Sequence, residues 1–129
     1  MPIIVGFTTK PEGQAALRHA VLEARAHEDS LLVVHIGSAT HHDTESALED
    51  DLAAARRMLT AAGVEHEVRQ LATREQPAGV IVDLAKELDA SMIVIGMRRR
   101  SPVGKLLLGG SIQQIMLDAS CPVVAVKAS

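Results

Sequence analysis

The feature that most constrains this chain is a regular alternation between short apolar runs and longer amphipathic segments. The runs Pro2–Phe7, Ser30–Gly37 and Ser91–Gly96 are rich in valine, isoleucine and leucine, and each ends in glycine or is followed by polar residues. Such runs are typical of strands buried on both faces. The order βαβαβαβαβ predicts one α/β domain over residues 1–129, with a parallel sheet covered by helices on both faces.

Four segments between the runs carry apolar residues at the spacing of one helix face. Pro11 suits the first turn of the first helix, and Gly63 suits the end of the second. The expected buried positions are Leu17, Ala20, Val21 and Ala24, then Leu48, Leu52, Ala55, Leu59 and Ala62, then Val80, Ile81, Leu84, Ala85 and Leu88, and finally Ile112, Ile115, Met116 and Ala119.

Two further strands are predicted to have different surroundings. The segment "VEHEVRQLA" alternates apolar and charged residues, which favours an edge strand. The last run, "PVVAVK" at residues 122–127, is apolar on both faces although it should also form a sheet edge. An exposed apolar edge invites pairing with another chain, so we expect a homodimer.

Composition argues against several classes of function. The only aromatic residue is Phe7 and the net charge is −3, so neither base stacking nor a basic footprint favours nucleic-acid binding. The single cysteine, Cys121, permits no internal disulfide, indicates a reducing compartment and is expected to be a small buried hydrophobe. No run approaches the roughly 18 apolar residues of a membrane span, and no basic stretch precedes the first run. We therefore expect a cytoplasmic protein.

The histidines and acidic residues form no strong catalytic or metal-binding pattern. His41, His42 and Asp43 could bind a metal, but without further ligands at helix or strand spacing a solvated loop is the better explanation. His35 lies within a predicted strand and is expected to be structural. No serine elbow, Ser–His–Asp context or carboxylate pair is apparent, so we expect no enzymatic activity.

The segment "GMRRRSPVGKLLLGGS", from Gly96 to Ser111, is the strongest candidate for a ligand site. It follows a predicted central strand and leads into a helix, and ligands of parallel sheets bind at the carboxyl ends of strands. A Walker A loop is excluded because Arg99 and Leu106 occupy positions that require glycine and Ser or Thr. Arg98, Arg99 and Arg100 suit either a solvated basic loop or a phosphate site beside a helix N-terminus.

The whole chain resembles the universal stress protein family, most specifically in "ASMIVIGMRRRSPVGKLLLGGSIQQIMLDASCPVVAVK". The resemblance implies an open five-stranded parallel sheet of order 3-2-1-4-5, of the adenine nucleotide alpha hydrolase-like type. It also implies dimerisation through the last strand. The residues expected to bind a nucleotide are Phe7, Thr8, Ile36, Gly96, Met97, Arg98, Arg99, Gly109, Gly110, Ser111 and Ile112.

One branch of that family binds ATP through a motif G-2x-G-9x-G-(S/T), and this chain matches it in part. Gly96 and Gly109 fit, whereas Arg99 replaces the second glycine and Gly110 the hydroxyl residue, with Ser111 following. Thr8 stands where the ATP binders usually carry aspartate. The resemblance thus leaves two alternatives: a stress or regulatory protein that binds ATP, with or without Mg²⁺, or a member that binds no nucleotide and associates with other proteins.

Overall fold

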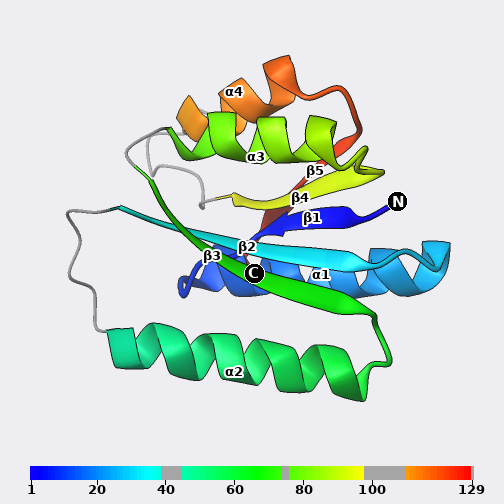
Figure 1. Cartoon of the computed structure of the whole chain (residues 1–129), viewed down its shortest axis with the longest axis vertical. Helices are drawn as coiled ribbons and strands as arrows, with labels where there is room; N and C mark the ends of the chain where they lie inside the picture. Colours follow the sequence, from blue (N-terminus) through cyan, green and yellow to red (C-terminus); the bar gives the residue numbers. More distant parts are fainter. Residues whose placement is uncertain (39–44, 74–75, 98–109, 129) are drawn as a thin grey trace.

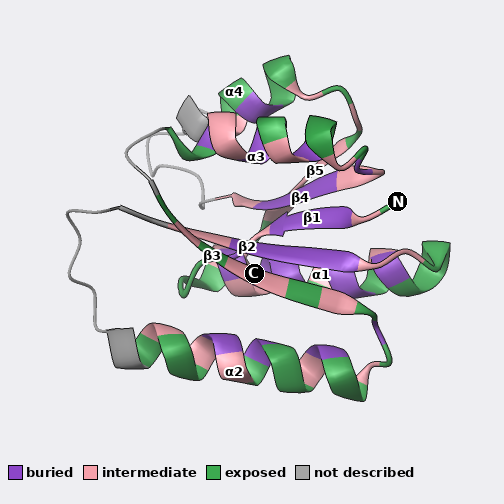
Figure 2. Ribbon diagram, in the orientation of Figure 1, coloured by how far each residue is buried: buried purple, intermediate pink, exposed green. Residues whose placement is uncertain are grey.

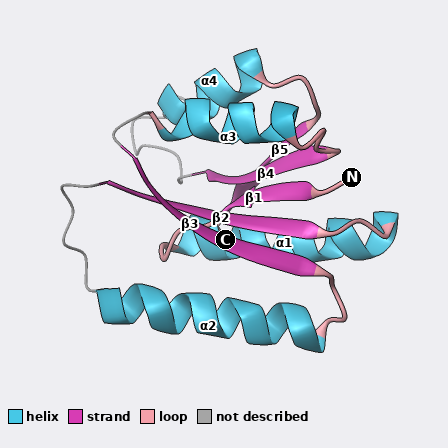
Figure 3. Ribbon diagram, viewed as in Figure 1, coloured by secondary structure: helices cyan, strands magenta, loops and turns pink. Residues whose placement is uncertain are grey.

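The structure, a computed structural model, describes residues 1–38, 45–73, 76–97 and 110–128. Strands and helices alternate along the chain (Figure 1, Figure 3). The strands are β1 (Ile3–Gly6), β2 (Leu31–Ser38), β3 (His66–Thr73), β4 (Met92–Met97) and β5 (Val123–Lys127). The helices are α1 (Pro11–His27), α2 (Glu45–Ala61), α3 (Pro77–Glu87) and α4 (Gly110–Asp118). The predicted order of elements is confirmed.

The strands form one parallel sheet in the order β3-β2-β1-β4-β5, as predicted. β1 is central: Ile4 pairs with Leu32 of β2 on one side and with Ile93 of β4 on the other. The chain therefore moves outward from β1 in one direction to β3, and then in the other direction to β5. Between β1 and β4 the strand order reverses, and in open parallel sheets this is where ligands bind.

Helices cover both faces of the sheet, α1 and α2 on one side and α3 and α4 on the other (Figure 1). Alternate residues of each central strand belong to different core clusters, because successive strand side chains point to opposite faces. Ile3 and Val5 join the cluster with α1 and α2, whereas Ile4 joins the cluster with α3 and α4. Burial is therefore concentrated along the middle strands (Figure 2).

Local signals account for several helix ends. Pro11 and Pro77 occupy the first turns of α1 and α3, where a missing backbone N–H costs nothing. α1 ends at Glu28, which adopts a left-handed conformation with φ of 56° and donates its backbone N–H to the carbonyl oxygen of Ala24. Gly63, with φ of 72°, follows α2 as the sequence predicted.

Two helix faces differ from the sequence prediction. In α3, Val82 is buried and Val80 is only partly buried, because the face against the sheet is formed by Ala78, Ile81, Val82 and Ala85. In α4, Ile115 is buried but Met116 is 42% exposed. α4 packs mainly against α3 and β5, and Ile115 faces this contact whereas the next residue along the helix is turned toward solvent.

Cys121 is also less buried than the sequence predicted. Its side chain is partly buried and packs at the margin of the cluster with α3 and α4. This position precedes β5, the edge strand, which lacks a neighbouring strand on its outer side within the described sheet. An edge position covers fewer sides of a residue than a central one, which explains the remaining exposure.

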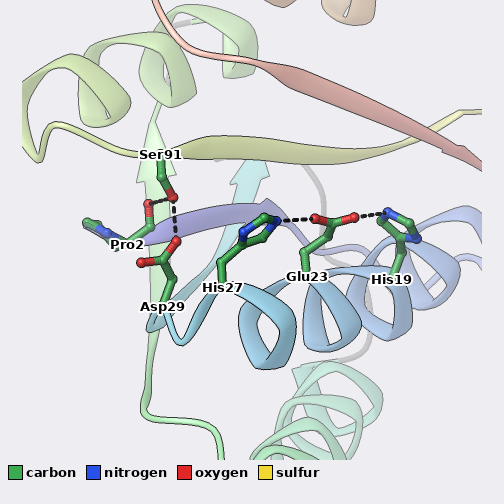
Figure 4. A network of polar contacts seen from close by, with 6 residues as sticks. All are labelled: Pro2, His19, Glu23, His27, Asp29 and Ser91. Carbon is green, nitrogen blue, oxygen red and sulfur yellow. Dashed lines mark hydrogen bonds and ion pairs between the residues drawn. The ribbon is translucent and has the colours of Figure 1, made fainter.

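A small set of polar contacts holds the amino-terminal edge of the sheet together (Figure 4). The hydroxyl of Ser91 donates to the Asp29 carboxylate at 3.0 Å, and the Ser91 backbone N–H donates to the Pro2 carbonyl oxygen at 2.9 Å. These bonds connect the start of β1, the turn after α1 and the turn before β4. They lie at the opposite end of the strands from the carboxyl edge.

Candidate functional site

A cleft of about 260 Å³ lies where the carboxyl ends of β1, β2 and β4 meet the starts of α1, α3 and α4. Most of its described lining is apolar and comes from strand ends and from the two helices α3 and α4. The lining residues are Gly6, Phe7, Thr8, Glu12, Gly13, Val34, Ile36, Pro77, Ala78, Ile81, Ile95, Gly96, Ile112 and Ile115.

Two glycines let the start of α1 approach the sheet beside this cleft. A Cβ atom on Gly96 would collide with the backbone carbonyl of Glu12, and one on Gly13 would collide with the backbone of Thr8. Neither backbone can move aside as a flexible side chain would. Gly96, expected from the sequence as a ligand-binding glycine, is therefore required first for packing of β4 against α1.

Gly6 occupies a different kind of position. A Cβ atom there would lie 3.5 Å from Ile81 Cδ1 and 3.5 Å from Ile95 Cγ2, an ordinary van der Waals contact. Both of these side chains line the cleft. The absence of a side chain at Gly6 therefore leaves room on the floor of the cleft rather than relieving a collision.

Polar groups are few in the described lining. Thr8 is exposed, and its hydroxyl accepts a hydrogen bond from the Lys10 backbone N–H at 3.3 Å, which leaves the hydroxyl hydrogen to donate elsewhere. Glu12 is partly buried, lies in the first turn of α1 and is the only charged residue among the lining residues that the structure describes.

The helix N-termini at this edge differ in their charge. The start of α1 carries Glu12, whereas the first turns of α3 and α4 carry no acidic residue. The first backbone N–H groups of a helix lack partners within it and, together with the helix dipole, favour an anion. Of the helices that border the cleft, α4, which begins at Gly110 and contributes Ile112 to the lining, is better suited to an anionic group than α1.

The structure brings five of the predicted site residues together in the lining: Phe7, Thr8, Ile36, Gly96 and Ile112. Met97, at the end of β4, is outside the lining. Gly110 and Ser111 belong to the first turn of α4. Arg98, Arg99 and Gly109 lie outside the described residues, as do Arg100, His41, His42 and Asp43.

Phe7 borders the cleft in a way the sequence did not reveal. Its side chain is 1% exposed and packs in the cluster with α1 and α2, because it follows Ile3 and Val5 on the same face of β1. The cleft lies on the side of α3 and α4. Phe7 therefore stabilises the core beneath α1, and its ring does not form a stacking surface in the cleft.

Sequence reasoning missed the contributions of α1 and α3. Pro77 and Ala78 line the cleft because α3 starts beside the end of β2, and Glu12 does so because α1 starts between β1 and β4. The signal available for Pro77 was its position just after a predicted strand, at a predicted helix start. The remaining residues missed were Gly6, Gly13, Val34, Ile81, Ile95 and Ile115.

Two titratable side chains outside the lining have a pKa that burial shifts from its ordinary value. Partial burial lowers the pKa of His35, near the end of β2, below its ordinary value. Burial also raises the pKa of the Cys121 thiol, and a backbone hydrogen bond opposes part of that effect. Within the described ranges, no group of three or more His, Cys, Asp or Glu residues could hold a metal ion, and no helix has the length and hydropathy to cross a membrane.

The reversal of strand order and the cleft beside it define a doubly wound α/β protein with a ligand-sized opening at its switch point. Comparison with known proteins narrows this class. The model of the universal stress protein family matches residues 1–127, and the chain belongs to that family.

Three relatives illustrate the likeness. A universal stress protein of Mycolicibacterium smegmatis is 37% identical over 97% of this chain and 96% of its own. A universal stress protein structure from Archaeoglobus fulgidus is 34% identical, with a TM-score of 0.82 and 98% of both chains covered. A structure from the same organism in complex with dAMP is 29% identical, with a TM-score of 0.75 and 98% of both chains covered.

Proposed function

We propose that this universal stress protein binds an adenine nucleotide in the cleft and acts as a regulatory or stress-response protein, with ATP, alone or with Mg²⁺, as the first ligand to test. The observation that carries this proposal is the cleft itself, which combines an apolar slot with a helix N-terminus at the switch point. The Archaeoglobus fulgidus relative in complex with dAMP supports the choice of an adenine nucleotide.

Different parts of the cleft suit different parts of a nucleotide. Val34, Ile36 and Ile81 offer apolar contact to the faces of a base. The backbone N–H groups at the start of α4 offer hydrogen bonds to phosphate oxygens, and the helix dipole favours the negative charge. The base is thus expected among the apolar side chains, with the phosphates directed toward Gly110.

Thermal unfolding with and without ligand provides a direct test. A ligand that binds only the folded state stabilises it by about 2.7 kcal/mol at a hundredfold excess over its Kd. For a chain of 129 residues this corresponds to a rise in Tm of roughly 10 °C. ATP, ADP and AMP should raise the Tm, with and without Mg²⁺, whereas CTP should raise it less. No shift with any adenine nucleotide at about 10 mM would refute the proposal.

The substitution Gly6→Ala tests whether the nucleotide binds in the cleft. The added methyl group would fill space between Ile81 and Ile95 at ordinary contact distance, so the protein should fold normally while the cleft becomes smaller. With a nucleotide bound, the methyl group would overpack its contact with the floor of the cleft, and a cost of about 1–3 kcal/mol corresponds to a loss of affinity of at least fivefold. Gly79→Ala is the matched control, because its Cβ atom would meet nothing within 4 Å.

We further propose that the protein acts by binding, without turnover of the nucleotide. Incubation of the purified protein with ATP and Mg²⁺ should release no phosphate above the rate of a buffer control. Phosphate release that scales with protein concentration and is lost in Gly6→Ala would show that the cleft is an active site instead.

The alternative function, association with other protein chains, rests on β5. This strand pairs with β4 on one side only, and Val123, Val124, Ala125 and Val126 are only partly buried. We propose a homodimer that forms through residues 122–127, which would cover this edge. Light scattering at tens of micromolar should give twice the mass of 13.7 kDa, and a monomer at that concentration would contradict the proposal.

A further inference from the structure

The outer edge of β5 leaves backbone hydrogen-bonding groups without a strand to pair with. β5 pairs with β4 on one side, and within the described sheet no strand lies on its other side. Residues 123–126 are apolar and only partly buried. An edge of this kind is a template on which another strand can add.

The register with β4 shows which backbone groups of β5 face the open edge. Ile93 pairs with Val123, and the Ile93 backbone N–H donates to the Pro122 carbonyl oxygen at 2.9 Å. Both backbone groups of a strand residue point to the same side, and that side alternates along the strand. The backbone groups that point to the open edge therefore belong to alternate residues of β5, which are Val123, Ala125 and Lys127.

We propose that two copies of this chain pair antiparallel through these groups, with the two-fold axis between Ala125 and the partner's Ala125. This proposal rests on the proposed homodimer and assigns its register. In antiparallel strands, residues whose backbone groups face each other exchange two hydrogen bonds. An axis at Ala125 also places Val123 opposite the partner's Lys127, so three such pairs form within the strand. An axis one residue to either side leaves only two pairs.

The side chains of β5 suit the same register. Val124 and Val126 pack against the cluster with α1 and α2, whereas Ala125 packs against the cluster with α3 and α4. Directly opposed residues of an antiparallel pair project to the same face of the sheet. Val124 therefore meets the partner's Val126, and opposed β-branched side chains of this kind stabilise a sheet.

The other edge of the sheet does not suit such pairing. β3 carries Glu67 and Arg69, which form an ion pair at 3.0 Å, whereas the only charged residue of β5 is Lys127. Charged side chains on an edge strand discourage pairing with another chain. Only one edge is then used, and pairing of that edge with itself gives a closed dimer rather than an open fibre.

The axis also fixes where the two clefts lie. Each cleft lies at the carboxyl ends of β1, β2 and β4. Because antiparallel strands run in opposite directions, the carboxyl ends of the two sheets point to opposite ends of the dimer. The clefts therefore open away from each other, and the register can be tested without a nucleotide.

Disulfide cross-linking distinguishes the possible axes. Each variant carries Cys121→Ala, which removes the single cysteine of the chain, and one new cysteine in β5. In Ala125→Cys the two Cα atoms lie about 5.5 Å apart, a separation that a disulfide spans. In Val124→Cys the two copies of the cysteine lie diagonally, about 7–8 Å apart, which is too far.

With oxidised glutathione and tens of micromolar protein, Ala125→Cys should become a covalent dimer. Val124→Cys and Val126→Cys should each remain uncross-linked when oxidised alone. An equimolar mixture of these two variants should form a covalent heterodimer, because the proposed register places the two positions directly opposite each other.

Ala125→Pro provides a test that does not depend on oxidation. The N–H that it removes points to the open edge, so pairing with β4 is preserved, and proline is tolerated at such positions of an edge strand. Loss of the hydrogen bonds at the axis should raise the Kd of the dimer about tenfold or more in sedimentation experiments, with an unchanged circular dichroism spectrum. Val124→Pro removes an N–H that points to β4 and should lower the Tm instead.

Other outcomes overturn identifiable parts of the proposal. If Val124→Cys or Val126→Cys cross-links alone and Ala125→Cys does not, the copies pair through β5 in another register. If Ala125→Pro folds and keeps the original dimer Kd, the edge of β5 is not the contact. If light scattering shows the unaltered protein to be a monomer, the proposed homodimer fails first and its register fails with it, while nucleotide binding is left standing.

Discussion

Gly96→Ala tests whether the glycine at the end of β4 serves packing or only ligand binding. The sequence placed Gly96 in a partial nucleotide motif, whereas the structure places it against the backbone carbonyl of Glu12. The substitution adds one methyl group at a point where backbone faces backbone. A purely ligand-binding glycine would tolerate that methyl group in the absence of ligand, and a packing glycine would not.

The size of the effect follows from the contact. To restore a normal separation, the first turn of α1 must move by about 1 Å relative to β4. α1 carries Ala16 and Leu17 into the core, at 0% and 2% exposure, so this movement opens gaps beneath the helix. Inserting a methyl group into a packed core costs about 1–3 kcal/mol. We expect a loss near the upper end, about 2–3 kcal/mol, and a fall in Tm of roughly 10 °C.

Urea unfolding followed by far-ultraviolet circular dichroism is the appropriate assay, because the chain has no tryptophan or tyrosine to report fluorescence. Gly79→Ala is again the control: its Cβ atom lies in open space within α3, so it should be neutral or stabilise by up to about 1 kcal/mol. A Gly96→Ala protein within about 0.5 kcal/mol of the original, without nucleotide present, would refute the packing role.

Three further predictions concern groups away from the cleft. Ser91→Ala removes the hydroxyl that donates to Asp29 at 3.0 Å, so unfolding should become easier by about 1 kcal/mol in urea titrations, and no change would show that water replaces the bond fully. Burial lowers the pKa of His35, so the unfolded chain takes up a proton more readily than the folded one. The free energy of unfolding should therefore fall as the pH drops below about 6.5. His35→Gln should reduce that loss when urea titrations at pH 5.5 and 7.5 are compared, and an unaltered pH dependence would show that His35 does not cause it. The raised pKa of Cys121 predicts slower alkylation by iodoacetamide at pH 8 than in the urea-unfolded chain, and equal rates would count against protection by burial.

The order of elements was predictable because it depends on local periodicity. Runs such as Pro2–Phe7 and Ser91–Gly96 have the composition of buried strands, and the structure places strands at Ile3–Gly6 and Met92–Met97. The burial of individual residues was harder to predict where it depended on which other elements pack against a helix. Met116 fits the apolar stripe of α4 yet is exposed, because the contacts of α4 with α3 and β5 cover a narrower face of the helix.

The cleft was predictable in its place but not in its composition. Its location followed from the rule that parallel sheets bind ligands at the carboxyl ends of strands. Thr8 and Ile36 were predicted to lie in the site because each follows or ends a recognisable strand. The presence of Glu12 in the lining was not predicted, since a glutamate in a first helical turn has an ordinary local explanation in the helix dipole.

By itself, the sequence determined the alternation of strands and helices, most of the helix positions that would face the core and the two strands that would lie at the edges. Periodicity carries this information because it reflects one segment and its contact with a core. Only the tertiary structure decided that Gly96 packs against α1, that the Phe7 side chain packs in the core beneath α1 and that Glu12 lines the cleft. Those facts depend on the distances between segments far apart in the chain, which no local pattern contains.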